Sequence, residues 1–160
     1  MDTNRKHGGG ETVAIMADKM FLYFAYGSNM DEDQMEYRCP GAKLLCKITV
    51  PDYTFRIDSR GVASIIPKRG AEVTGLLWEI DKYHIQSLDR FEGIKGGYYR
   101  KVGLPLVIER RTETAIAYLS NYDCDGRYPP KPGYMEKIVR AAKDHGFDEA
   151  YIRELETFLP

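Results

Sequence analysis

The sequence lacks several features that would mark particular classes of protein. It has only three cysteines and three histidines among 160 residues, and no two cysteines form a CxxC pair. A structural zinc site is therefore not expected, and the odd number of scattered cysteines indicates a reducing compartment and small, partly buried side chains. No apolar run approaches the ~18 residues of a membrane-spanning helix. The first residues contain Gly8 to Gly10 but no apolar stretch, which is not typical of a secretory signal peptide.

An excess of charge is also missing. Lys and Arg total 23 against 24 Asp and Glu, so no basic surface for nucleic acid is indicated. Hydrophobic residues make up 43% and charged residues 29%, as in an ordinary globular domain. The length fits a single domain, predicted to span residues 20–160 behind a polar, disordered tail of residues 1–19. Tyrosine is abundant, with 12 copies, and suits a lined cavity as well as a core.

Hydrophobic periodicity and turn residues predict the order of elements. The expected strands cover residues 21–26, 44–55, 62–66, 72–80, 99–108 and 112–119, and the expected helices cover 30–38, 81–92, 134–144 and 148–159. Gly75 lies inside a predicted strand, where glycine often marks a close approach of backbones. Strands in runs with helices at both ends favour an α+β fold with a mixed, barrel-like sheet and flanking helices.

Three features carry candidate chemistry. The passage from Phe21 to Met30 joins a strand to a helix through Gly27, and such a turn exposes backbone N–H groups that can bind an anion. A tight turn that only starts a helix is the alternative. Ser28 lacks the GxSxG context of an esterase nucleophile.

Glu92 follows Phe91 at a helix end and precedes a glycine-rich loop. Apolar surroundings would raise the pKa of its carboxyl group and suit it to general acid/base work, whereas a solvated surface glutamate is the alternative. Six tyrosines lie near strand ends and loops beyond Glu92. They are Tyr98, Tyr99, Tyr118, Tyr122, Tyr128 and Tyr134. Strand alternation allows only one of Tyr98 and Tyr99 to face a shared cavity.

The segments FLYFAYGSNM, GVASIIP, EVTGLLWEI, SLDRFEGIKGGYY, AIAYLSNY and PPKPGYMEKIVRAAKDHG occur here in this order. In this combination the chain resembles the gamma-glutamylcyclotransferases from Phe21 to its last residue. The resemblance implies an enzyme that releases 5-oxoproline and a free amino acid from a γ-glutamyl amino acid, with Glu92 as general acid/base. It also implies a set of substrate-binding residues, which are Tyr23, Phe24, Ala25, Tyr26, Gly27, Ser28, Asn29, Tyr99, Tyr118 and Tyr134.

The expected partner is a small-molecule substrate, with no cofactor, metal, nucleic acid or membrane. A cytoplasmic location is expected, and a homodimer is plausible from the frequency of homo-oligomers. Three alternatives stay open at this point. The leaving group could be an amine or part of a γ-glutamylated pathway intermediate, another enzyme could use the scaffold, or the protein could bind a small molecule without turnover.

Overall fold

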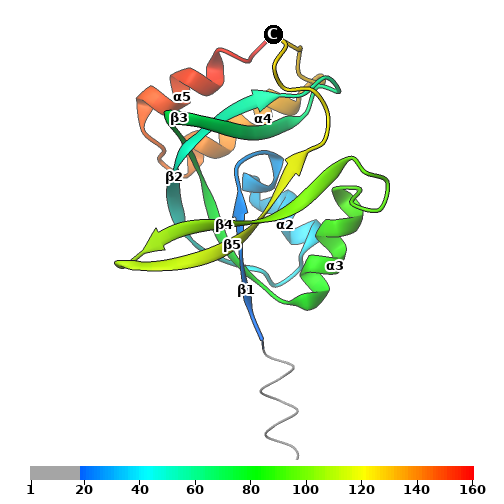
Figure 1. Ribbon diagram of the computed structural model, residues 1–160, viewed down its shortest axis with the longest axis vertical. Coiled ribbons are helices and arrows are strands. Elements are labelled where there is room, and N and C mark those ends of the chain that lie inside the picture. The colour runs from blue at the N-terminus through cyan, green and yellow to red at the C-terminus, as the bar shows by residue number, and fades with distance from the viewer. Residues whose placement is uncertain (1–18) are drawn as a thin grey trace, which may run out of the picture.

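The computed structural model describes residues 19–160, and the predicted tail of residues 1–19 lies outside that range apart from Lys19. The elements, in chain order, are β1 (Phe21–Ala25), the 3-10 turn η1 (Ser28–Met30), α2 (Glu32–Arg38), β2 (Lys43–Ile57), β3 (Ala63–Ile80), α3 (Lys82–Phe91), β4 (Tyr99–Ile108), β5 (Arg111–Ser120), α4 (Tyr134–Asp144) and α5 (Glu149–Glu156). Figure 1 shows them in the order of the chain.

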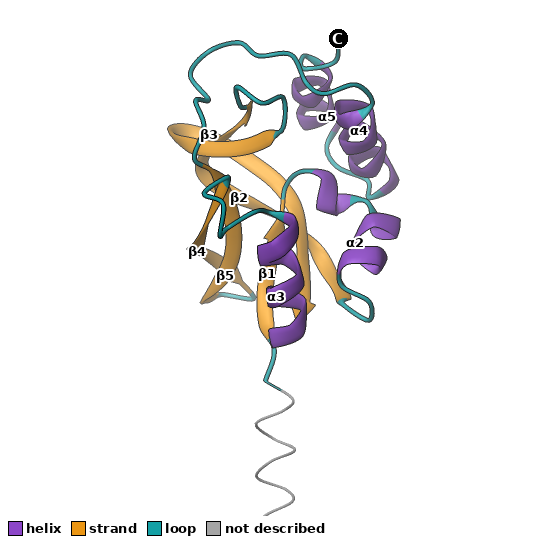
Figure 2. Ribbon diagram, turned by 90° about the vertical axis from the view of Figure 1, so that its right-hand side faces the viewer, coloured by secondary structure: helices purple, strands orange, loops and turns teal. Residues whose placement is uncertain are grey.

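The five strands form one mixed sheet in the order β2-β3-β1-β5-β4. Two antiparallel hairpins, β2–β3 and β4–β5, lie on either side of β1, which pairs antiparallel with β3 and parallel with β5. The predicted α+β class is confirmed. The sheet keeps two edges, β2 and β4, so the expected barrel-like closure is only a loose description. Helices α2, α4 and α5 lie together on one side of the strands (Figure 2).

Strand β3 is continuous where the sequence predicted two strands separated by a turn at Pro67 to Gly70. Strand β2 pairs with β3 along almost the whole length of both strands, and the hairpin bends at a register shift between Pro51 and Tyr53. Asp52 has a positive φ of 64° at this bulge, and its Oδ1 accepts a hydrogen bond from the N–H of Gly70 at 3.0 Å. The turn residues therefore bend the hairpin without interrupting it.

Two helix ends also differ from the prediction. The helix expected from Met30 begins at Glu32, because Asp31 adopts an extended conformation and its side chain caps the N–H of Gln34. The last helix ends at Glu156 and not at Leu159. Asp81 caps the start of α3, and His84 completes a capping box there.

One hydrophobic core joins the sheet to the helices. Its fully buried members include Phe24, Leu77, Ile80, Leu88 and Ile138. Among the cysteines, Cys39 and Cys124 are buried as expected, while Cys46 is exposed. Within the described chain, no helix is both long and apolar enough to cross a membrane.

Candidate functional site

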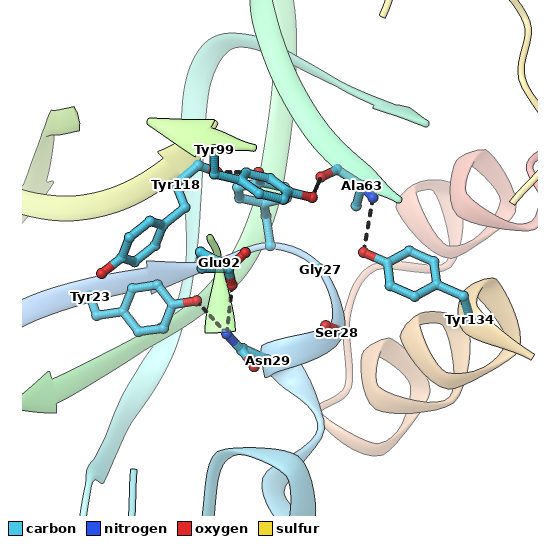
Figure 3. A pocket seen from close by; sticks show the side chains of 10 residues that line it. Tyr23, Gly27, Ser28, Asn29, Ala63, Glu92, Tyr99, Tyr118 and Tyr134 are labelled. Atoms are coloured by element: carbon cyan, nitrogen blue, oxygen red, sulfur yellow. Dashed lines mark hydrogen bonds between the residues drawn. The ribbon is translucent and has the colours of Figure 1, made fainter. Parts of the chain in front are cut away.

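A small cavity lies where the end of β1, the end of α3 and the first residue of α4 approach one another. It holds about 320 Å³ of empty space including its open mouth. Figure 3 shows its lining residues, which are Tyr23, Tyr26, Gly27, Ser28, Asn29, Ala63, Glu92, Tyr99, Tyr118 and Tyr134. The cavity thus gathers residues that are far apart in the sequence around one carboxylate.

The wall from Gly27 to Asn29 is a turn of backbone. Gly27 precedes the turn η1 (Ser28–Met30), and its carbonyl accepts from the N–H of Met30 at 3.0 Å. The first N–H groups of a helical turn have no partner inside it, so this wall suits an anion. A Cβ atom on Gly27 would lie 3.2 Å from the Cβ of Ala63, so a glycine leaves room between the two walls.

The carboxylate of Glu92 is held in place by the end of helix α3. Glu92 is the C-cap residue, and its N–H donates to the carbonyl of Leu88 at 2.8 Å. Its side chain is only 15% exposed. Burial raises the pKa of the Glu92 carboxyl group, while the charges of Arg38 and Arg60 and a hydrogen bond from Asn29 oppose part of that rise. The raised pKa agrees with the sequence prediction.

Asn29 connects this carboxylate to the tyrosines. Its Nδ2 donates to the hydroxyl of Tyr23 at 2.8 Å and to Oε1 of Glu92 at 3.3 Å. Its Oδ1 accepts from Nε2 of Gln34 at 2.8 Å and from Nη1 of Arg38 at 3.1 Å. Because Gln34 and Arg38 both donate to the side-chain oxygen of Asn29, its amide nitrogen is the atom that faces the cavity.

A second layer of side chains supports Asn29. Gln34 Nε2 also donates to Oγ of Ser28 at 2.8 Å, and Lys137 Nζ on α4 donates to Oε1 of Gln34 at 2.9 Å. Arg38 Nη1 lies 3.8 Å from Oε1 of Glu92. No motif in the sequence predicted a role for Gln34, Arg38 or Lys137. Their only sequence signal is that the first two lie on the helix that follows the Gly27 turn.

Two tyrosine hydroxyls of the cavity donate hydrogen bonds to backbone carbonyls. Tyr99 donates to the carbonyl of Ala63 at 2.7 Å, and Tyr26 donates to the carbonyl of Tyr118. Each hydroxyl then has only its oxygen lone pairs left for a ligand. Tyr26 and Tyr99 are therefore hydrogen-bond acceptors at the cavity wall.

Two other tyrosine hydroxyls have the opposite polarity. Tyr134 accepts from the N–H of Ala63 at 2.9 Å, and Tyr23 accepts from Asn29. Both keep an O–H proton to donate. The cavity tyrosines stay uncharged because burial raises the pKa of each, namely Tyr23, Tyr26, Tyr99, Tyr118 and Tyr134.

Tyr118 contributes its ring more than its hydroxyl. The hydroxyl donates to Oδ1 of Asp89 at 2.7 Å, and Asp89 in turn pairs with Lys101 at 2.9 Å. The ring meets Tyr23 edge to face, with centroids 5.9 Å apart. The ring of Tyr118 thus forms an apolar part of the cavity wall, while its hydroxyl is bonded to Asp89.

Two of the predicted substrate-binding residues do not line the cavity. Phe24 is turned to the other face of β1, where its ring packs against Gly75, and Ala25 is buried in the strand. Side-chain alternation along β1 accounts for Phe24, since it places Tyr23 and Phe24 on opposite faces. Ala63 lines the cavity and was not predicted, although it lies in the quoted segment GVASIIP.

Only one of Tyr98 and Tyr99 faces the cavity, as predicted, but strand alternation is not the reason, because Tyr98 lies in the bend before β4. Tyr99 lines the cavity, whereas Tyr98 faces outward and is 47% exposed. Among residues 19–160 no group of three His, Cys, Asp or Glu side chains is arranged to hold a metal ion.

Comparison with known proteins places this architecture in a family. The sequence profile of the AIG2-like family matches residues 72–155. A human gamma-glutamylcyclotransferase is 31% identical over 96% of this chain and 87% of its own length, and a mouse gamma-glutamylcyclotransferase is 33% identical over 88% and 79%. A solved structure of a gamma-glutamyl cyclotransferase superimposes with a TM-score of 0.79 at 30% identity, covering 89% of each chain.

The family profile covers about half of the chain, while the two relatives and the solved structure cover most of it. The chain therefore belongs to the AIG2-like family and, within it, to the gamma-glutamylcyclotransferases, which are enzymes. A Bacillus subtilis structure, YkqA, is 19% identical with a TM-score of 0.74, and it shows the shared fold alone.

Proposed function

We propose that this enzyme converts a γ-glutamyl amino acid to 5-oxoproline and a free amino acid, with Glu92 as general acid/base. The observation that carries the proposal is the mostly buried Glu92 carboxylate, which faces a cavity lined by tyrosines and by the Gly27–Asn29 turn. The human and mouse relatives, both named gamma-glutamylcyclotransferase, support the same reaction class.

The nucleophile in this reaction belongs to the substrate. The α-amine attacks the γ-carbonyl carbon, the new C–N bond closes a five-membered ring, and the original amide C–N bond breaks. Intramolecular attack reaches effective molarities of ~10⁵–10⁸ M when the chain is held folded. The enzyme therefore needs to hold the glutamyl chain and to move protons, but it needs no covalent bond between the enzyme and the substrate.

Glu92 is the group that moves the protons. Its ionised form takes a proton from the α-ammonium, and its neutral form delivers a proton to the leaving nitrogen. Over one turnover two protons leave the α-nitrogen and two reach the departing amine, so Glu92 returns to its starting state. The raised pKa of Glu92 favours both roles near neutral pH.

The polarity of the remaining wall suits the rest of the substrate. Tyr26 and Tyr99 offer lone pairs to an ammonium group. Tyr23 and Tyr134 offer O–H donors, and the amides of the Gly27–Asn29 turn add more, for a carboxylate or for the oxyanion of the tetrahedral intermediate.

Glu92→Gln tests the proposal. The neutral amide cannot accept the ammonium proton, so we expect release of 5-oxoproline from γ-glutamyl-alanine to fall at least 100-fold. Thermal unfolding should stay near that of wild type, and Glu154→Gln on the exposed face of α5 serves as a matched control. Activity of Glu92→Gln within threefold of wild type would remove Glu92 from the mechanism.

A protein that only binds γ-glutamyl compounds would behave differently. Calorimetry on the wild-type protein would then show saturable binding of γ-glutamyl-alanine, with the compound recovered intact. A buried carboxylate of raised pKa argues for turnover, because a simple binding site gains little from desolvating such a group.

A further inference from the structure

A second group of side chains adjoins the cavity and has no part in the proton transfers. It comprises Asp58 and Arg60, in the turn between β2 and β3, and Tyr98, Tyr99 and Tyr122, near the ends of β4 and β5. Tyr99 belongs to both places, since its ring lines the cavity and also lies under the guanidinium of Arg60, at 4.9 Å from Cζ to the ring centroid. Tyr99 therefore connects the group to the cavity.

Arg60 is held rigidly on one edge. Its Nη2 and Nε donate to Oδ2 of Asp58 at 2.7 and 3.2 Å, and Nη2 approaches Oγ of Ser120 at 3.4 Å. Asp58 is itself fully buried and accepts from the N–H of Arg60 at 2.8 Å and of Val62 at 3.3 Å. The hydroxyl of Ser120 on β5 also donates to Oδ2 of Asp58, at 2.6 Å, so Asp58 is bonded from both sides and fixes the direction in which the guanidinium points.

The remaining nitrogen of the guanidinium, Nη1, is not used in these hydrogen bonds. The side chain of Arg60 is 22% exposed, and within residues 19–160 its Nη1 donates to no protein atom. Tyr122 and Tyr98 also flank it, with ring centroids 4.3 and 5.5 Å from Cζ. A preorganised arginine whose Nη1 has no partner among residues 19–160 can donate to an anion such as a carboxylate.

The two outer tyrosines form an exposed apolar platform beside the guanidinium. Their rings stack at 15° with centroids 6.1 Å apart, and Tyr98 and Tyr122 are 47% and 40% exposed. The ring of Tyr98 lies on Gly93 and Gly96, where a Cβ atom would come within 2.7 and 2.8 Å of it. Gly93 directly follows Glu92, so the platform packs against the turn that follows the proposed general acid.

We propose that Arg60 binds the carboxylate of the leaving amino acid, with the rings of Tyr98 and Tyr122 beneath the body of that amino acid. The proposal rests on the proposed function and deepens it, because it assigns a residue that would select the leaving group. A γ-glutamyl compound whose leaving group bears a carboxylate would be preferred over one that releases an uncharged or cationic amine. The proximity of Arg60 to the reacting groups is supported by its electrostatic influence on Glu92.

Two substrates that differ only in that carboxylate provide the test. Release of 5-oxoproline is measured with γ-glutamyl-alanine and with γ-glutamyl-alaninamide. We expect wild type to prefer the carboxylate in kcat/KM by about 10- to 100-fold, as a charge-assisted hydrogen bond from arginine would give. Arg60→Gln should lower kcat/KM for γ-glutamyl-alanine by a similar factor and leave the amide within threefold.

Further variants keep the result interpretable. Arg153→Gln, on the exposed face of α5, should leave both substrates unchanged. Should Arg60→Gln fail to fold because Asp58 loses its partner, Arg60→Lys keeps a charge there but loses the planar fork, and a reduced preference for the carboxylate is expected. Equal turnover of the two substrates by wild type, or an equal loss on both in the Arg60 variants, would overturn the subsite alone. Absence of turnover with either substrate would overturn the proposed function as well.

Discussion

The carboxyl group of Glu92 lies between opposing influences, and their balance sets its chemistry. Burial at the end of α3 raises its pKa, while the guanidinium of Arg38, at 3.8 Å, and the charge of Arg60 lower it. Asn29 contributes a hydrogen bond whose direction is fixed by Gln34 and Arg38. The residue can therefore be tuned through neighbours that need not touch the substrate.

Arg38→Gln tests this balance at the residue scale. Loss of the positive charge makes ionisation of Glu92 harder, so its pKa rises further. The acidic limb of the pH profile of kcat/KM, along which Glu92 takes up its proton, should move to higher pH. Arg90→Gln on α3 is the control and should move the limb less, because the exposed Arg90 side chain forms no ion pair with Glu92 and only its backbone carbonyl bonds to the Glu92 N–H. A limb that stays in place or moves to lower pH in Arg38→Gln would contradict the assignment of this limb to Glu92.

At the scale of elements, the position of β1 determines the site. The strand lies between the two hairpins, carries Tyr23 on its cavity face and delivers the chain to the Gly27 turn. Its close approach to β3 depends on Gly75. A Cβ atom there would lie 2.4 Å from the carbonyl oxygen of Ala25 and 2.7 Å from the ring of Phe24.

Gly75→Ala should therefore destabilise the protein. The added methyl group would clash with backbone atoms of β1, which can move only if the strand pairing is distorted. We therefore expect a loss of about 2–3 kcal/mol in the free energy of unfolding. Gly103→Ala, in β4, is the matched control, because its Cβ would meet only the methyl group of Thr114, at 3.0 Å. Urea unfolding measures both. Equal stabilities of the two variants would show that the approach of β1 to β3 is not set by Gly75.

At the scale of the whole molecule, one core joins the sheet and the helices of residues 20–160. The net charge of −1 leaves no strong long-range field, which suits a small zwitterionic substrate. That residues 1–19 contribute nothing to this domain stays a prediction, as do a cytoplasmic location and a homodimer.

A chain that begins at Met20 tests the domain boundary. Since the core described for the protein needs no residue before Phe21, its free energy of unfolding should stay within about 0.5 kcal/mol of the full chain. The kcat/KM for γ-glutamyl-alanine should also remain within twofold. A chain that begins at Ala25 and so lacks most of β1 should fail to fold, as the contrasting control. A marked loss of stability in the Met20 chain would give residues 1–19 a structural role.

The sequence by itself determined the features that depend on neighbours along the chain. The pattern of α4 fixed Tyr134 to Asp144, and Gly75 marked a close backbone approach. The motifs that carry the family resemblance also contain most of the cavity residues. Such features follow from short-range periodicity and from the steric properties of single residues.

Only the tertiary structure decided which distant groups meet and with what polarity. The fold brings both Tyr99 and Tyr134 within hydrogen-bond distance of the Ala63 backbone. Tyr99 donates to its carbonyl and is left as an acceptor toward a ligand, whereas Tyr134 accepts from its N–H and is left as a donor. The same folding turns Lys137 towards Gln34 and leaves Nη1 of Arg60 out of the hydrogen bonds to Asp58 and Ser120. The bonds of Tyr99, Tyr134 and Lys137 join residues that are tens of positions apart. Whether a hydroxyl donates or accepts depends on the group that the fold places beside it. No local pattern carries that information.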